Sequence, residues 1–177
     1  VRLKCGDPFI FGRLVEEISY LRDQQINFEI VPGISSAIAG PGSAGIPLTA
    51  RGYSSNVTIV SGSLKKNKLN LDWIELLKIR NHTIVVLMGL KKAGEIVEAA
   101  INAGVNLDLP TAIVCNANRP NQKNIYTTLR HLSKESLNAE SPAIIIFGNV
   151  VKLSNIISVE KDKFESYCFR VYLSWIY

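Results

Sequence analysis

Three short runs of apolar residues do most to limit the folds available to this chain. They occupy residues 83–87, 111–114 and 143–147, and almost every side chain in them is apolar. Runs of this length, bounded by turn-forming residues, are typical of strands buried on both faces of a sheet. All three are far shorter than the roughly 20 apolar residues that a membrane-spanning helix needs. We therefore expect an α/β fold and no membrane insertion.

Segments with helical spacing alternate with strand-like segments along the rest of the chain. Residues 14–22 carry apolar side chains at positions 14, 15, 18 and 21, the spacing of one helix face. The same criteria predict further helices at 71–79 and 95–103, the second ended by Gly104, and further strands at 28–31, 57–60 and 125–129. Strands alternating with helices are the units of a parallel α/β sheet.

The first thirteen residues combine a strand-like start with a turn suited to a ligand. Residues 1–4 alternate apolar and basic side chains, which predicts a strand. Gly6 lacks a Cβ and allows the backbone to approach a bound molecule closely. Asp7 and Pro8 are typical of the N-cap and the first position of a helix. A simple turn from strand to helix is the alternative interpretation of Gly-Asp-Pro.

Small side chains dominate residues 33–45. Ser35 or Ser36 is expected to cap a helix that starts here, and Pro41 is expected to interrupt or kink it. A helix N-terminus with small side chains favours close approach of a polar ligand, but it equally favours tight packing of helix on sheet. Composition alone leaves both interpretations open.

Charge and composition argue against several classes of function. The net charge of +5 includes a basic loop at 65–68 without interleaved aromatic residues, so a solvated loop is expected and nucleic-acid binding is not. Three widely spaced cysteines without a Cys-x-x-Cys pair fit a reducing, cytoplasmic setting. His82 and His131 are isolated, which does not support a zinc site. No Walker A or Gly-x-Gly-x-x-Gly motif occurs.

An ordered series of motifs extends from residue 2 to about residue 153. It begins with Arg-Leu-Lys-Cys-Gly-Asp-Pro-Phe-Ile-Phe-Gly-Arg at 2–13. It continues through Val-Pro-Gly-Ile-Ser-Ser at 31–36, Gly-Ile-Pro-Leu-Thr-Ala-Arg at 45–51, Val-Ser-Gly at 60–62, Leu-Met-Gly at 87–89, Ala-Ile-Val at 112–114 with Pro120 and Gln122, and Phe-Gly-Asn-Val at 147–150. A series in this order is far more specific than any single motif. It resembles the tetrapyrrole methylase family, and within it the C-methyltransferases that act on uroporphyrinogen III.

The resemblance implies a two-domain α/β fold of the tetrapyrrole methylase type, with the first domain incomplete. Residues 1–50 are then the remainder of the N-terminal domain and 51–158 the C-terminal domain, because 46–52 has the composition of a connector. Residues 159–177 form an aromatic-rich tail without a counterpart in the family. The first residue lies inside an expected strand, so we also expect the chain to continue upstream.

The resemblance also implies S-adenosyl-L-methionine as cofactor and C-methylation of uroporphyrinogen III to precorrin-2, in sirohaem or cobalamin synthesis. The positions that match the family's cofactor contacts are Cys5, Gly6, Asp7, Ile10, Ser35, Ser36, Met88 and Ala117. Arg2 and Arg13 match positions expected to face the carboxylates of the tetrapyrrole substrate, which guanidinium groups bind well. The catalytic acid/base groups are expected upstream of Val1.

By the same resemblance we expect a homodimer. Two alternatives remain open. The first is another precorrin methyltransferase, acting on a different ring carbon. The second is a non-catalytic fragment that retains part of the cofactor cleft.

Overall fold

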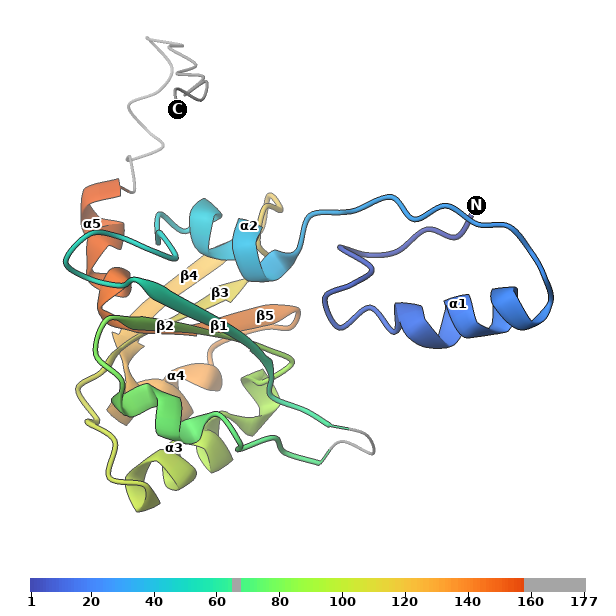
Figure 1. Cartoon of the computed structure of the whole chain (residues 1–177). Coiled ribbons are helices and arrows are strands. Elements are labelled where there is room, and N and C mark those ends of the chain that lie inside the picture. The colour runs from blue at the N-terminus through green and yellow to red at the C-terminus, as the bar shows by residue number, and fades with distance from the viewer. Residues whose placement is uncertain (65–67, 158–177) are drawn as a thin grey trace, which may run out of the picture.

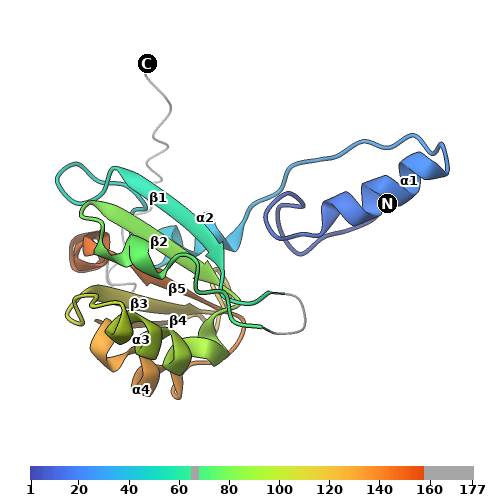
Figure 2. The same ribbon diagram turned by 60° about the horizontal axis from the view of Figure 1, so that its bottom comes forward.

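The computed structural model describes residues 1–64 and 68–157, and these form a layered sheet with an N-terminal arm. The arm, residues 1–34, contains one helix, α1 (Leu14–Asp23), and extends away from the sheet in both views (Figure 1, Figure 2). The remaining helices and all five strands of the described residues belong to the second part. The predicted strands at 57–60, 83–87, 111–114 and 143–147 lie in this sheet, as does the one predicted at 125–129 except for Leu129, which begins a 3₁₀ helix.

The sheet has the strand order β1-β2-β5-β3-β4. Its strands are β1 (Asn56–Ser61), β2 (His82–Leu87), β3 (Pro110–Cys115), β4 (Lys123–Thr128) and β5 (Ala143–Phe147). β1 pairs with β2 in parallel, whereas β5 is antiparallel to both β2 and β3, and β4 is antiparallel to β3. β1, β2 and β3 therefore run in one direction, and their carboxyl ends meet at one edge of the sheet.

Helices cover both faces of the sheet (Figure 1). One face carries α3 (Ala93–Asn102), α4 (Leu132–Ser136) and the 3₁₀ helices Ile74–Lys78, Leu90–Lys92 and Leu129–His131. The other carries α2 (Ser36–Ser43), the 3₁₀ helix Asn149–Leu153 and α5 (Ser154–Ile157). Successive side chains of a strand point to opposite faces. In β5, accordingly, Ile145 packs in the first layer and Ile146 in the second, both fully buried.

The helix predicted at 95–103 is confirmed as α3, and Gly104 follows it with φ +73°. The Gly104 amide donates to the carbonyl of Ile101, so the residue ends the helix as predicted. The helix predicted at 71–79 is shorter: only residues 74–78 are helical, and they form a 3₁₀ helix. Residues 72 and 73, before this helix, form a turn, and the indole of Trp73 donates to the Asn70 carbonyl at 2.9 Å.

The arm differs most from the sequence-based expectation. The helix at 14–22 is confirmed as α1, but the strands predicted at 1–4 and 28–31 are wrong, because both segments lie outside any strand. A strand satisfies its backbone groups only beside a second strand, and no described residue pairs with either segment. No residue of α1 is fully buried, and Leu14, Ile18 and Leu21 on its apolar face are half-buried.

Some expectations concern residues outside this description. The tail at 159–177 and most of the basic loop at 65–68 lie outside the described residues. The domain boundary at residue 50 stays a prediction. Among helices of the described residues, none has the length and apolar character needed to span a bilayer.

Candidate functional site

At the carboxyl edge of the sheet, glycines from the ends of two neighbouring strands are in direct contact. β1 leads into Gly62 and β2 into Met88 and Gly89. A Cβ placed on Gly62 would lie only 2.6 Å from the Cα of Gly89, so these two backbones touch directly. Two neighbouring strands therefore leave the sheet with no side chains between them.

Met88 and Ala117, two of the predicted cofactor contacts, both lie at this edge. Met88 follows β2 in the left-handed region with φ +57°, and 54% of its surface is exposed. Ala117 follows β3 between two left-handed asparagines, Asn116 and Asn118. β5 separates β2 from β3, so one strand lies between the two positions.

The loop around Asp7 is held by the segment that precedes α2. One carboxylate oxygen of Asp7 accepts the Phe9 amide at 2.8 Å, and the other accepts the Gly33 amide at 3.0 Å. A Cβ on Gly33 would lie 3.0 Å from the Gly6 carbonyl oxygen, so Gly33 and Gly6 are in backbone contact. The structure thus brings the predicted contacts at positions 5–7 beside those at positions 35 and 36.

The expected helix start at Asp7 and Pro8 is wrong. Residues 8–12 form turns, and α1 begins only at Leu14, after Arg13 in the left-handed conformation. The Asp7 side chain makes the short-range bond to Phe9 that a cap would make, but its second bond reaches Gly33, 26 residues away. Of the remaining predicted contacts in this loop, Cys5 is exposed and Ile10 is half-buried.

Ser35 is the N-cap of α2, as predicted. Its hydroxyl oxygen accepts the Ala37 amide at 3.2 Å, and the residue is buried. Ser36 begins the helix and is exposed. Pro41 lies inside α2, and the helix continues past it to Ser43, so it does not interrupt the helix; the other expectation, a kink at Pro41, stays a prediction.

α2 connects the arm to the carboxyl edge of the sheet. A Cβ on Gly40 would lie 3.5 Å from the Ala117 Cβ and 2.5 Å from the Cδ1 of Ile144, so the helix packs directly on the sheet here. Ile144 in turn pairs with Leu87, the residue before Met88. Both open interpretations of the small residues therefore retain support: Gly40 serves helix packing, and the capped end of α2 is adjacent to the Asp7 loop.

Arg2 and Arg13 lie on the arm, at the first turn of α1. Arg2 donates to Glu17 at 3.3 Å, and Arg13 donates to Glu16 at 3.4 Å. Both arginine side chains are largely exposed. Their role toward a substrate stays a prediction.

Lys4 is a residue of this cluster to which the sequence assigned no role. Its ammonium group donates to both oxygens of Glu17 at 2.9 Å, and its side chain is only 17% exposed. The hydrogen bond from Lys4, together with the charges of Lys4 and Arg2, holds the pKa of the Glu17 carboxyl below its ordinary value of 4.5. In the sequence, the alternation that places basic side chains at Arg2 and Lys4 was the feature that could have indicated this cluster.

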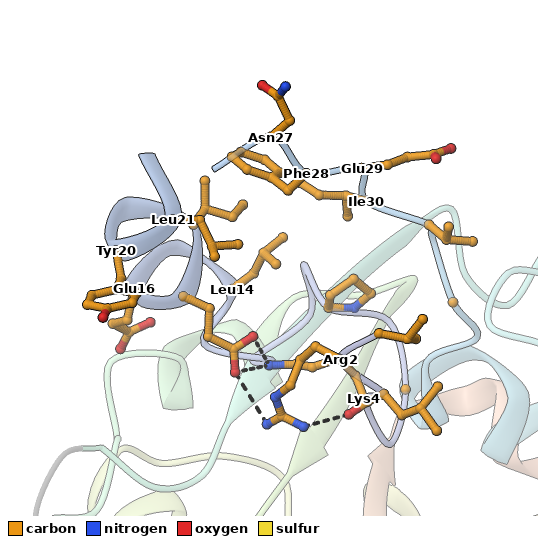
Figure 3. A pocket seen from close by; sticks show the side chains of 18 residues that line it. Arg2, Lys4, Leu14, Glu16, Tyr20, Leu21, Asn27, Phe28, Glu29 and Ile30 are labelled. Carbon is orange, nitrogen blue, oxygen red and sulfur yellow. Dashed lines mark hydrogen bonds and ion pairs between the residues drawn. The ribbon is translucent and has the colours of Figure 1, made fainter. Parts of the chain in front are cut away.

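A hollow of about 1110 Å³ lies within the arm (Figure 3). Leu14, Leu21 and Phe28 lie on one side of it, and Arg2 and Lys4 on the other. Of the predicted site residues only Arg2 and Gly6 line this hollow, so it is distinct from the contacts around α2 and the carboxyl edge. Within the described part of the chain, no three His, Cys, Asp or Glu side chains come close enough to hold a metal ion.

Comparison with known proteins gives a family, a curated relative and two solved structures. The profile of the family described as Tetrapyrrole (Corrin/Porphyrin) Methylases matches residues 1–133. A siroheme synthase of Zymomonas mobilis is 43% identical over 158 residues, covering 89% of this chain and 33% of that protein. The chain thus spans about a third of the length of the curated relatives it matches.

Two solved structures share the fold. The uroporphyrin-III C-methyl transferase of Thermus thermophilus, complexed with S-adenosyl homocysteine, superposes with a TM-score of 0.73 at 30% identity, covering 84% of this chain and 64% of that one. A cobalt precorrin-4 methyltransferase superposes with a TM-score of 0.75 at 26% identity, covering 85% and 64%. The α/β fold expected from the sequence is confirmed by these superpositions.

Proposed function

Because this chain belongs to the tetrapyrrole methylase family, we propose that it binds S-adenosyl-L-methionine and serves the C-methylation of uroporphyrinogen III to precorrin-2, in sirohaem or cobalamin biosynthesis. Identity to a siroheme synthase and to a uroporphyrin-III C-methyl transferase supports this choice within the family. By the same reasoning we propose a homodimer located in the cytoplasm.

One observation carries the proposal: segments far apart in sequence that match the family's cofactor contacts are joined by direct contacts. Asp7 bonds to the Gly33 amide, two residues before the cap of α2. α2 then packs through Gly40 against Ala117 and against Ile144, beside the end of β2. A cofactor with several polar groups needs contacts from several segments at once, and this arrangement supplies them.

The side chains present fit such a cofactor. The Asp7 carboxylate has about four acceptor positions, and the Phe9 and Gly33 amides use two of them, so acceptor capacity remains for a ligand. The exposed Met88 offers an apolar contact, and the small side chain of Ala117 is half-buried beside α2. Glycine at positions 6 and 33 also serves the loop contact itself, because a Cβ would lie 3.3 Å and 3.0 Å, respectively, from a backbone oxygen.

Methyl transfer from this cofactor depends on binding and orientation of the two reactants more than on a reactive side chain. S-adenosyl-L-methionine supplies a methyl group on a sulfonium, which is already a good leaving group. The chain's part is to hold donor and acceptor in line, which contributes a large share of the rate in such reactions. Arg2 and Arg13 would orient the substrate, because a guanidinium pairs with a carboxylate through two parallel hydrogen bonds.

The first test is calorimetric titration with S-adenosylhomocysteine of the chain and of Asp7→Ala. We expect binding that is lost or weakened at least tenfold in Asp7→Ala, because two loop contacts and one ligand acceptor disappear together. Asp72→Ala is the matched control, since Asp72 is an exposed aspartate before the 3₁₀ helix at 74–78. Equal affinity in all three proteins would reject this cofactor site.

A transfer assay separates the alternatives. Labelled S-adenosyl-L-methionine and uroporphyrinogen III are incubated with the chain, and methylated product is measured. Transfer to a precorrin instead of uroporphyrinogen III would support the alternative of another precorrin methyltransferase. The superposition on the cobalt precorrin-4 methyltransferase favours this alternative. Cofactor binding without any transfer would support a non-catalytic role.

A further inference from the structure

Three side chains of the β3–β4 region bind carbonyl groups of α2. Asn118 donates to the Ala39 carbonyl at 3.3 Å, Gln122 to the Ser43 carbonyl at 3.2 Å, and the Tyr126 hydroxyl to the Ala44 carbonyl at 2.7 Å. Donors and acceptors are separated by 79 to 82 residues in the chain. Ser43 and Ala44 lie at the end of α2, where carbonyls lack intrahelical partners, so two of the three bonds supply such partners.

α2 depends on such outside contacts because its own sequence is a poor helix former. Its eight residues are Ser-Ala-Ile-Ala-Gly-Pro-Gly-Ser, with Gly40, Pro41 and Gly42 in succession. Proline removes a hydrogen-bond donor, and each glycine costs about 1 kcal/mol relative to alanine. Contacts from the β3–β4 region therefore set the position of α2 and of its N-terminal end at Ser35 and Ser36.

Asn118 and Gln122 both tie α2 to the loop carrying Ala117: Asn118 belongs to that loop, whereas Gln122 bonds to the loop and to the helix at once. Its Oε1 accepts the Asn118 amide at 2.7 Å, while its Nε2 donates both to Ser43 and to Asn124 Oδ1 at 3.0 Å. Only one orientation of the side-chain amide satisfies an N–H on one side and a carbonyl on the other. Tyr126, by contrast, bonds to α2 without bonding to that loop.

We propose that Gln122 is a positioning residue that sets the spacing between the Ser35–Ser36 end of α2 and Ala117, and that cofactor affinity depends on this spacing. The second half of this inference rests on the proposed function, since both ends of that spacing are predicted cofactor contacts. The first half concerns the free chain and stands independently of any ligand.

The experiment compares Gln122→Ala, Gln122→Glu and Tyr126→Phe with the unchanged chain. Gln122→Glu keeps an acceptor for the Asn118 amide but places a carboxylate oxygen opposite the Ser43 carbonyl and Asn124 Oδ1, so it removes both donated bonds, the one to the helix included, and keeps the accepted one. Tyr126→Phe removes a bond of the same kind from the same helix and leaves the Ala117 loop bonds intact. Two quantities are measured: amide hydrogen exchange without ligand, and affinity for S-adenosylhomocysteine.

We expect both Gln122 variants to speed exchange at the Ala39 and Ala44 amides, which are hydrogen-bonded in the described helix. Exchange at Ile145 in β5 should not change, because the sheet does not depend on Gln122. Affinity should fall about three- to tenfold, the usual effect of one hydrogen bond, whereas Tyr126→Phe should stay within about twofold.

Unchanged exchange in Gln122→Glu would overturn the inference, as would an equal loss of affinity in Tyr126→Phe and Gln122→Glu. Faster exchange throughout the sheet would also overturn it, because Gln122 would then support the fold in general. If the unchanged chain does not bind S-adenosylhomocysteine, the proposed function fails instead. The exchange comparison would still decide whether Gln122 couples α2 to the loop.

Discussion

At the scale of single residues, the contact between Gly62 and Gly89 leaves no space for a side chain. A methyl group on Gly62 would lie 2.6 Å from a backbone atom, which cannot rotate away as a side chain can. We expect Gly62→Ala to lower the free energy of unfolding by about 1–3 kcal/mol, measured by denaturant titration. The control is Gly42→Ala, where nothing lies within 4 Å of the new methyl group and the helix gains up to about 1 kcal/mol. Equal stability of the two variants would contradict the close contact.

The Lys4–Glu17 pair predicts a dependence on pH at the first turn of α1. The pKa of Glu17 is lowered in the folded chain, so the pair's stabilisation is present above about pH 4.5 and is lost as the pH falls through the lowered pKa. An NMR titration of the Glu17 carboxyl should give a midpoint below 4.5. Lys4→Ala should move that midpoint upward, since it removes the largest cause. A midpoint that Lys4→Ala leaves unchanged would rule out the pair as the cause.

Residue-level predictions from the sequence succeeded where the partner is local. Ser35 is the cap of α2 because its hydroxyl reaches an amide only two residues along the chain. Asp7 was misassigned as a helix cap because its second partner, the Gly33 amide, is 26 residues away. A local pattern contains no information about such a partner. The bond from Gln122 to the Ser43 carbonyl was not predicted either, because the two residues are 79 positions apart.

At the scale of secondary structure elements, β5 and α1 should differ sharply in their tolerance of substitution. Ile146 in β5 is fully buried, and truncation to alanine should lower the free energy of unfolding by about 2–5 kcal/mol. Val15 in α1 is 75% exposed, so Val15→Ala should change it by no more than about 0.5 kcal/mol. Denaturant titration of both variants checks the difference. A large loss in Val15→Ala would mean that α1 is packed in solution.

Sequence-based prediction was most accurate for the elements that are most deeply buried. Strands β2, β3 and β5 carry apolar residues toward both layers, so each strand could be recognised in the sequence as a continuous run of apolar residues. Residues 28–31 have a similar local pattern but lie outside any strand, because a strand needs a neighbour as well as a propensity. Pattern alone does not distinguish the two cases.

At the scale of the whole molecule, the arm and the sheet should differ in amide hydrogen exchange. Amides of β5 bond to strands on both sides, whereas residues 27–32 lie outside every helix and strand. We expect residues 27–32 to exchange almost as fast as an unfolded peptide, and β5 to exchange only on global unfolding. Slow exchange at 28–31 would show that this segment pairs with another strand in solution.

The mixed sheet itself could not be predicted from the alternation of strands and helices. That alternation is typical of parallel units, and β1 with β2 follows it. β5 enters between β2 and β3 in the opposite direction, which depends on contacts between residues about 60 and 30 positions apart in the chain. Family resemblance identified the fold where the local pattern could not.

The place of β5 has a consequence for the order of events during synthesis. The strand that joins the two halves of the sheet is the last of the five to leave the ribosome. Until then the β1–β2 pair and the β3–β4 hairpin each present an open edge, and open edges attract other chains. Ribosome-bound chains that end before residue 143 are therefore the species of this protein most in need of a chaperone.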